Sequence, residues 1–177
     1  MVIGLFMKTA GCGMVVMGTS GYGACLAGNY KSRLALLEQL RQMIFLLKGQ
    51  IVYANAPLPE AFEAVGRRTK GILAELFVRV AERLEGQQGE PLFHIWQEEV
   101  EKLSEAGGLT KKDRQCLAAF GEHLGFLDRD MQERNLLLYL EQLDLTIGEL
   151  RGHKEERCRL YTSLGVMGGL FLAVLLL

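Results

Sequence analysis

Histidines are the first side chains to consider for chemistry in this sequence, because they serve as metal ligands and as acid–base groups. His94, His123 and His153 lie far apart along the chain. None belongs to an HExxH pair, and no acidic residue stands at a spacing that would complete a metal site on one helix. We therefore expect each histidine to be packed in the core or exposed to solvent, and we predict no metal site.

A run of glutamates is the second candidate, since paired carboxylates can exchange protons with a substrate. Four of them fall within eight residues: Glu98, Glu99, Glu101 and Glu105. Because this stretch has a helical apolar period and Lys102 offers local pairing, we interpret the run as the solvated face of one helix.

Two further patterns also fail as sites. The glycine-rich GTSGYG at residues 18–23 lies inside an apolar stretch and lacks the lysine–serine or lysine–threonine pair of a phosphate loop. The four cysteines form no CxxC and no Cys/His ligand spacing, so reduced thiols are expected. We predict no catalytic residue, no cofactor and no metal, and hence a protein that is not an enzyme.

The elements that carry these residues follow from the layout of charge. Every charged side chain except Lys8 lies between Lys31 and Arg159, and the net charge is −1. Acidic and basic residues alternate in this block, which argues against a nucleic-acid partner, and nothing indicates a small-molecule substrate. We predict three parts: residues 1–30, a helical bundle over residues 31–159, and residues 160–177.

The two flanking parts are predicted to be transmembrane. Residues 160–177 would cover about 27 Å as a helix, close to the ~30 Å of a hydrocarbon core. The first part is uncharged over residues 9–30 but holds six glycines. It is read as a membrane span or uncleaved signal-like anchor; a cleaved signal peptide and a lipoprotein signal ending at Cys25 are the alternatives.

Basic residues next to the expected spans predict the orientation. They lie on the side of the central block: Lys31, Arg33, Arg151, Lys154, Arg157 and Arg159. The positive-inside rule then places residues 31–159 in the cytoplasm.

The central block is predicted to be all-α, with six helices and no strand, because its apolar period is helical throughout. The helices should cover about residues 30–54, 57–70, 72–84, 91–106, 110–126 and 128–159. Apolar seams mark the first helix (Leu37, Leu40, Ile44, Leu47, Ile51 and Ala54), the fourth (Leu92, Ile95, Trp96, Val100 and Leu103) and the sixth (Leu136, Leu140, Leu143, Ile147 and Leu150).

Two features of the ends stay open at this point. The sixth helix either continues unbroken into residues 160–177 or breaks at Gly148 or Gly152. Small residues recur every four positions in both expected spans: Ser20, Ala24 and Gly28, then Gly165, Gly169 and Ala173. Such stripes let membrane helices approach closely, either within one chain or between partners, although the glycines could also simply be tolerated in a short anchor.

Four segments in order carry a family resemblance: YKSRLALLEQL, QIVYANAPLPEAFEAV, LAAFGEHLGFLDRDMQ and the terminal YTSLGVMGGLFLAVLLL. With them the chain resembles the bacterial stage III sporulation protein AB family over nearly its whole length. The strongest carriers are Tyr53, Pro57, Leu58, Pro59, Glu60 and Ala61, and then Gly121, Leu124, Gly125, Asp128 and Gln132. The sequence departs from the family pattern at Gln50 and Leu127, where a glutamate and a serine are frequent.

The resemblance implies a membrane component of the complex that connects mother cell and forespore in endospore-forming bacteria. It implies a cell-membrane location, in the outer forespore membrane with the bundle in the mother-cell cytoplasm. The family is similar to the inner-membrane platform proteins of type II secretion and type IV pilus systems, whose cytosolic modules are six-helix bundles. The implied partners are the companion sporulation ATPase (the AA protein) and other membrane proteins of the same operon, and self-association is left open.

Three residues at corners of the bundle are candidate contacts for a partner: Glu60, Asp128 and Gln132. Their alternative role is structural, as caps or turn residues. Other functions stay open as well: a membrane-anchored regulatory adaptor, or a ligand-binding or enzymatic bundle, which would need polar side chains converging in the core.

Overall fold

The computed structural model describes residues 28–86, 89–103, 108–124 and 129–176, and it leaves out the side chains of residues 123, 129, 153–166 and 168–176. The chain divides into two compact units. One is Arg33–Gly148, and the other combines Met1–Ser32 with Glu149–Leu177. The first unit holds most of the described side chains and is the bundle considered below.

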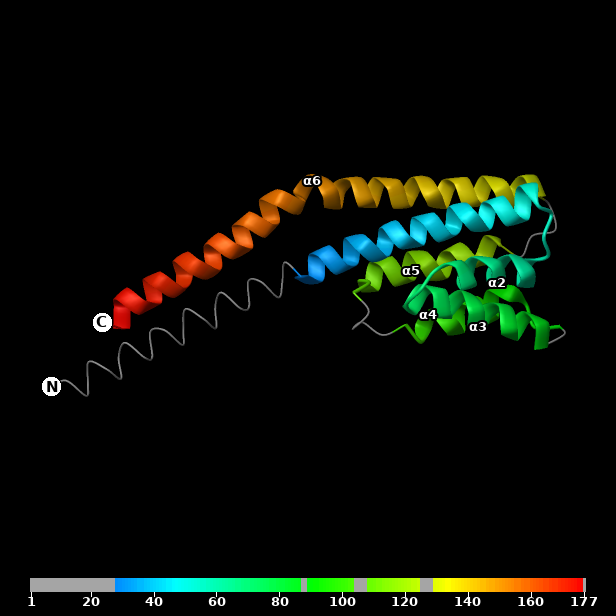
Figure 1. Cartoon of the computed structure of the whole chain (residues 1–177), viewed down its shortest axis with the longest axis horizontal. Helices are drawn as coiled ribbons and strands as arrows, with labels where there is room; N and C mark the ends of the chain where they lie inside the picture. The colour runs from blue at the N-terminus through cyan, green and yellow to red at the C-terminus, as the bar shows by residue number, and fades with distance from the viewer. Residues whose placement is uncertain (1–27, 87–88, 104–107, 125–128, 177) are drawn as a thin grey trace. The chain divides into compact units, whose positions relative to one another are not determined.

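Six α-helices and no strand make up the described residues, which confirms the all-α prediction (Figure 1). The first helix covers residues 28–48 and ends in a π-helical turn, η1 (Gly49–Tyr53). The others are α2 (Leu58–Arg68), α3 (Ile72–Gly86), α4 (Leu92–Glu101), α5 (Lys111–Phe120) followed by the 3-10 turn η3 (Gly121–His123), and α6 (Arg129–Leu176).

Some helix ends differ from the prediction. Helix α5 ends at Phe120 instead of continuing to residue 126, because the chain tightens into η3. The first helix loses its α-helical pitch at Gly49, where the Ala54 amide donates five residues back to the Gly49 carbonyl. Helix α6 has helical backbone through Gly148 and Gly152, so the unbroken alternative is the one observed.

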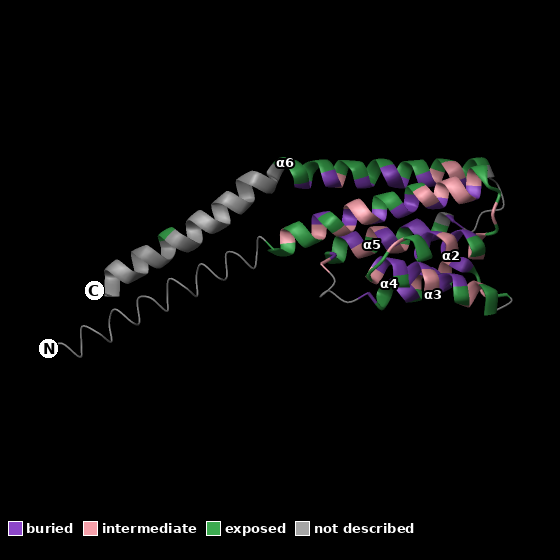
Figure 2. Ribbon diagram, in the orientation of Figure 1, coloured by how far each residue is buried: buried purple, intermediate pink, exposed green. Residues whose placement is uncertain are grey.

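Predicted apolar seams form the core (Figure 2). The seam residues of the first, fourth and sixth helices are all buried except Ala54, which is exposed because it follows the π turn at the end of its helix. Burying each large apolar side chain contributes about 1.5–3 kcal/mol. These faces therefore supply the main driving force for assembling the bundle.

An aromatic chain runs through the middle of this core and touches five helices. Ring centroids lie 5.2 Å apart for Phe62 and Phe77, 5.6 Å for Phe62 and Trp96, 5.8 Å for Phe77 and Trp96, and 5.8 Å for Trp96 and Phe120. Phe120 then stacks on Tyr139 of α6 at 4.4 Å. Trp96 is fully buried, and its indole Nε1 donates to the Leu117 carbonyl over 2.7 Å, so its polar atom is satisfied.

Ion pairs attach the first helix to α5 and α6, the last two helices of the chain. Arg33 donates to both carboxylate oxygens of Asp113, at 2.8 and 2.9 Å. Asp113 also closes a capping box with Thr110 at the start of α5. Arg41 pairs with Asp144, and Lys48 pairs with Glu133 at 3.4 Å, which shows that the first helix and α6 run antiparallel.

Among the described residues, no helix is long and apolar enough to cross a membrane. Residues 1–27 of the first expected span lie outside them. Most side chains of residues 160–177 also lie outside the described part of the structure. Both membrane spans therefore stay predictions.

Gly121 limits the packing around Trp96, because a Cβ atom at this position would lie 2.1 Å from the indole Cδ1. We expect Gly121→Ala to lower the free energy of unfolding by about 1–3 kcal/mol, the usual cost of overpacking a core. Urea titration followed by circular dichroism measures the change.

Gly148→Ala is the matched control, since nothing lies within 4 Å of its added Cβ and the position is helical. It should raise the free energy of unfolding by about 0.5–1 kcal/mol through helix propensity. Equal effects of the two substitutions would show that Trp96 does not constrain position 121.

Candidate functional site

The first family motif builds the corner between the first helix and α2. Pro57 stands in extended conformation with φ −55° and ψ 149°, and α2 begins at the next residue. Proline is well suited to a helix start because its missing amide hydrogen would have no partner there. Ala61 and Phe62 follow and are fully buried, so the start of α2 is held firmly against the core.

The same corner exposes an aromatic ring and a carboxylate. Tyr53 is 74% exposed, although it is a large ring at the end of a buried helix. Asn55 adopts φ 55°, a left-handed conformation that asparagine tolerates, and is also exposed. Glu60 is exposed in the first turn of α2. We call Tyr53, Asn55 and Glu60 together the α2 corner surface.

Glu60 therefore lies on the surface of this corner, and its role as a contact residue stays a prediction. Its structural alternative, as a side-chain cap, gains no support, since α2 starts without a side-chain cap hydrogen bond. A structural role for Glu60 then reduces to the favourable interaction of its carboxylate with the dipole of α2, worth about 0.3–1 kcal/mol.

Gln132 has a different environment in the second motif. It is buried, and its Nε2 donates to the Leu124 carbonyl over 3.1 Å. Leu124 is buried too, and Gly121 lies against Trp96. Gln132 thus ties the end of η3 to α6, as its structural alternative expects, while Asp128 lies outside the described residues.

The two motifs meet at one end of the bundle. Lys48, directly before η1, pairs with Glu133 in the first turns of α6. Figure 1 shows the end of the first helix and the start of α6 together at this end. The residues next to the two motifs are therefore paired at the same end of the bundle.

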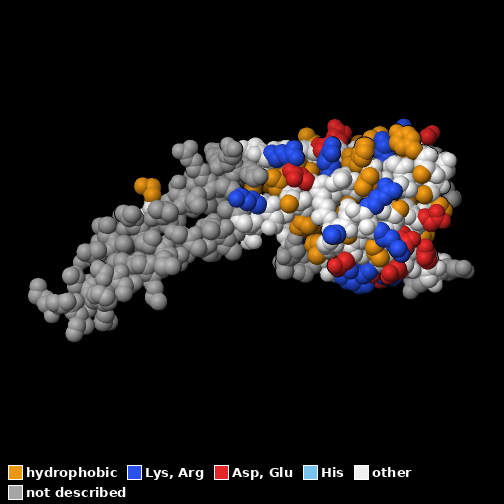
Figure 3. Space-filling view, viewed as in Figure 1, with side chains coloured by type: hydrophobic (Ala, Val, Ile, Leu, Met, Phe, Trp, Pro, Cys, Tyr) orange, Lys and Arg blue, Asp and Glu red, His pale blue; other side chains and the backbone are white. Residues whose placement is uncertain are grey.

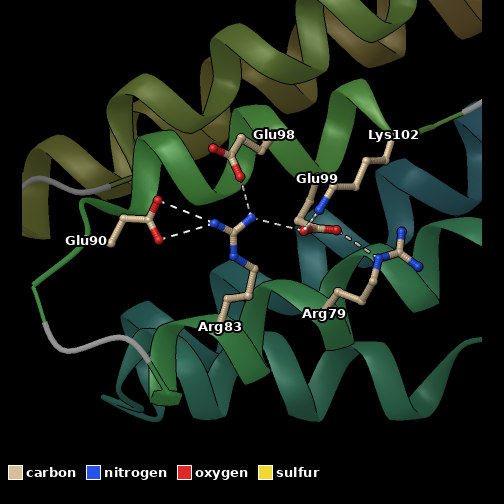
Figure 4. A network of polar contacts seen from close by, with 6 residues as sticks. All are labelled: Arg79, Arg83, Glu90, Glu98, Glu99 and Lys102. Atoms are coloured by element: carbon tan, nitrogen blue, oxygen red, sulfur yellow. Dashed lines mark hydrogen bonds and ion pairs between the residues drawn. The ribbon is translucent and has the colours of Figure 1, made fainter.

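The predicted solvated face of α4 is wrong for one of its glutamates. Glu99 is only 1% exposed and lies among three cations (Figure 4). Arg79 donates to its Oε2 over 2.9 Å, while Arg83 and Lys102 donate to its Oε1 over 3.1 and 2.5 Å. Arg83 also binds Glu98 at 2.8 Å and Glu90 at 3.2 Å. The sequence spacing alone could not show that α3 would bring two arginines to this side.

This network is a structural tie between α3 and α4. Burial alone would raise the pKa of Glu99, but hydrogen bonds from Lys102, Arg79 and Arg83 more than offset it and hold that pKa below its ordinary value. A carboxylate kept ionised and fully hydrogen-bonded has no proton to transfer and no free oxygen to offer.

Other candidate chemistry finds little support among the described residues. His94 is exposed, and the side chains of His123 and His153 lie outside the description, as do Cys12, Cys25 and Cys158. No group of three or more histidine, cysteine or acidic side chains in the described part could hold a metal ion. Of the small-residue stripes, only Gly28 has surroundings that the structure describes, and they are open.

The structure also has a groove between α5 and α6 that the sequence did not predict. It has a volume of about 300 Å³ and is lined by Cys116, Ala119, Phe120, Asn135, Leu138, Tyr139 and Gln142. Its lining is neutral, with two amides, a phenol and a thiol. No sequence pattern could reveal it, because it depends on how α5 crosses α6.

Comparison with known proteins gives a consistent result. The family model described as stage III sporulation protein AB matches residues 8–177. The chain is 26% identical to the stage III sporulation protein AB of Bacillus subtilis (strain 168) over 171 residues, 97% of this chain and 99% of the relative. A solved structure titled stage III sporulation protein AB (SpoIIIAB) superposes with a TM-score of 0.62 at 24% identity, covering 71% of this chain and 98% of that chain. The family expected from the sequence is confirmed.

Replacing Glu99 by glutamine tests the network at α4. A neutral amide keeps the shape but loses the charge-assisted hydrogen bonds, so we expect a loss of about 1.5–3 kcal/mol in the free energy of unfolding at pH 7. Because the folded pKa of Glu99 is lowered from 4.5, its contribution is present above that value and is lost as pH falls through the folded pKa. The variant should therefore lose less stability than the natural protein between neutral and acid pH, as urea titrations at several pH values measure.

Glu98→Gln is the control, because Glu98 is largely exposed and bonds only one cation of the network, Arg83. It should change stability by less than about 1 kcal/mol. The buried tie would be refuted if both variants had the same stability at pH 7.

Proposed function

The chain belongs to the stage III sporulation protein AB family, and from this premise we propose that it is a membrane platform without enzymatic activity. It takes part in the complex that connects mother cell and forespore during endospore formation. In this role the bundle binds the companion sporulation ATPase and holds it at the membrane.

The α2 corner surface supports the docking role most directly. Its residues belong to the strongest family motif, yet Tyr53, Asn55 and Glu60 contribute nothing to the core. An exposed tyrosine buries a large area at low entropic cost, which is why such rings are frequent at the centres of interfaces. The exposed carboxylate of Glu60 at the same corner can select a basic partner surface.

Rigidity at this corner also favours docking. Pro57 and Pro59 fix the backbone, Ala61 and Phe62 anchor the helix, and the Lys48–Glu133 pair closes the same end of the bundle. A surface that is already ordered loses little conformational entropy on binding.

Membrane attachment is the second part of the proposal. The uncharged stretches over residues 9–30 and 160–177 are long enough to span a bilayer, and the basic residues between them favour a cytoplasmic bundle. The location is then the outer forespore membrane, with the bundle on the mother-cell side. Small-residue stripes in the spans suit close helix packing, with each other or with membrane proteins of the same operon.

Transmission of force can be added to anchoring. The backbone hydrogen bonds of α6 continue from Arg129 to Leu176, so one helix joins the bundle sequence to the terminal apolar run. A movement imposed on the bundle by an ATPase could be passed along such a helix.

Tyr53→Ala and Glu60→Gln test the docking surface. Each should weaken binding of the full-length protein to the companion ATPase about tenfold, because each removes a central contact without disturbing the core. Light scattering and titration in detergent, with and without ATP, measure the affinity, and circular dichroism checks the fold.

Two matched controls accompany them. Phe45→Ala removes another exposed aromatic ring, and Glu75→Gln removes another acid from the first turn of a helix. Neither lies in the α2 corner surface, so affinity should stay unchanged. Equal losses at all four positions, or no binding by the natural protein, would reject this surface as the docking site.

Membrane attachment is tested by cell fractionation. The full chain should stay in the membrane fraction after an alkaline carbonate wash, and a chain lacking both residues 1–30 and 160–177 should be released. Release of the full chain would contradict the two-span proposal and leave the docking proposal standing.

A further inference from the structure

Exposed charges without an internal partner differ in sign between the two ends of the bundle. Toward the end where Arg33 begins the unit, four exposed cations pair with no other residue that the structure describes: Arg68, Lys70, Lys111 and Lys112. We call these four residues the basic end. Toward the opposite end, where Lys48 pairs with Glu133, four exposed carboxylates have no described partner either: Glu60, Glu82, Glu85 and Glu122. Figure 3 shows acidic side chains along that end, at the right of the view.

Contacts with the first helix fix the place of the basic end. Asp113 binds Arg33 at 2.8 Å, so the two lysines that open α5 lie beside the start of the first helix. The Nε2 of Gln39 donates to the Lys70 carbonyl over 2.7 Å, which holds the corner between α2 and α3 against the next turns of the same helix. From that corner α3 runs back along α2, so its last turn carries two glutamates to the end where α2 begins.

One exposed residue of the opposite sign, also without a described partner, lies toward each end. Glu101 closes α4 near the start of α5, and Arg134 lies in the first turns of α6. Arg67, next to the basic end, is already paired with Glu63. The charge that remains for a partner is therefore positive at the basic end and negative at the other end.

The chain itself keeps the basic end close to the expected bilayer. Arg33 stands three residues after Tyr30, where the uncharged stretch of residues 9–30 ends. A polypeptide extends at most about 3.6 Å per residue, so Arg33 lies within about 11 Å of the end of that stretch in any conformation. The inference rests on the proposed membrane attachment, under which Lys111 and Lys112, beside Arg33, are held near the lipid head groups.

We propose that the basic end is a lipid-binding surface, which lies on the anionic head groups of the membrane that anchors the chain. Cytoplasmic leaflets carry negative charge, and each lysine or arginine near such a surface strengthens the attraction about fivefold. The attraction extends over about one Debye length, ~8 Å at physiological salt. Side chains that have no carboxylate partner within the bundle are the ones free to respond to it. An acidic protein would attract the same cations, but the short connection from Arg33 to the uncharged stretch favours the membrane.

Lipid binding at the basic end would orient the bundle. The carboxylates at the opposite end are repelled by the same head groups, so that end turns away from the membrane. Glu60 is one of these carboxylates, and with it the α2 corner surface points into the cytoplasm. The charges thus keep the proposed docking surface accessible to a cytoplasmic partner.

Lysine acetylation in nanodiscs tests the proposal. The full-length chain is placed in nanodiscs of neutral phosphatidylcholine or of an equal mixture with anionic phosphatidylglycerol. Reaction of each lysine with N-hydroxysuccinimidyl acetate is then followed by mass spectrometry. Lys70, Lys111 and Lys112 should react about fivefold more slowly in the anionic nanodiscs. Sodium chloride at about 0.5 M should remove the difference, because salt screens the attraction.

Arg134→Lys supplies a reporter lysine toward the opposite end, and it should react equally in both kinds of nanodisc. The double variant K111E/K112E should restore the reactivity of Lys70 in anionic nanodiscs, because half of the basic end is then reversed. Arg134→Glu is the matched reversal at the other end and should leave the protection of Lys70 unchanged. Circular dichroism confirms that each variant folds.

Equal reactivity of the three lysines in neutral and anionic nanodiscs would overturn the proposal and leave the membrane attachment standing. Protection that neither salt nor K111E/K112E relieves would also overturn it, since a contact with protein would then cover these lysines. A chain that elutes apart from the nanodiscs would reject the membrane attachment itself, and this proposal with it.

Discussion

Burial of Trp96 is the constraint on which the bundle depends. Its ring contacts aromatic side chains of three neighbouring helices, and the chain of rings continues to Tyr139 on α6. A ring of this size leaves no room for a side chain at position 121. The turn η3 that follows α5 must therefore pass with a glycine against the indole.

The two motifs that identify the family have different structural roles around this core. The motif that contains Gly121, Leu124 and Gln132 points inward and fixes the frame. The motif that contains Tyr53 and Glu60 keeps part of its residues outside. Such a division separates residues that maintain the fold from residues available to a partner, which the linear order of the two motifs does not reveal.

Helical periodicity made the six helices, their apolar seams and the Thr110–Asp113 cap predictable, because each depends on residues close in sequence. Glu99 was misjudged, since its burial depends on Arg79 and Arg83 of another helix. The groove beside Tyr139 and the pairing of Arg33 with Asp113 also escaped prediction, because both arise from helices that meet only in the folded bundle. Glu60 could be chosen from its motif, but the exposure of Tyr53 needed the structure.

The ion pairs of the first helix have a consequence for how the chain is made. In each pair the acidic partner is synthesised 80 or more residues after the basic residue of the first helix. The pairs are Arg33–Asp113, Lys48–Glu133 and Arg41–Asp144. Helices α3 and α4 can close their own network early, because it joins residues about 20 apart. During translation the first helix must wait with its leucine face uncovered until α6 has emerged from the ribosome, so the nascent chain is most prone to misfolding at its beginning.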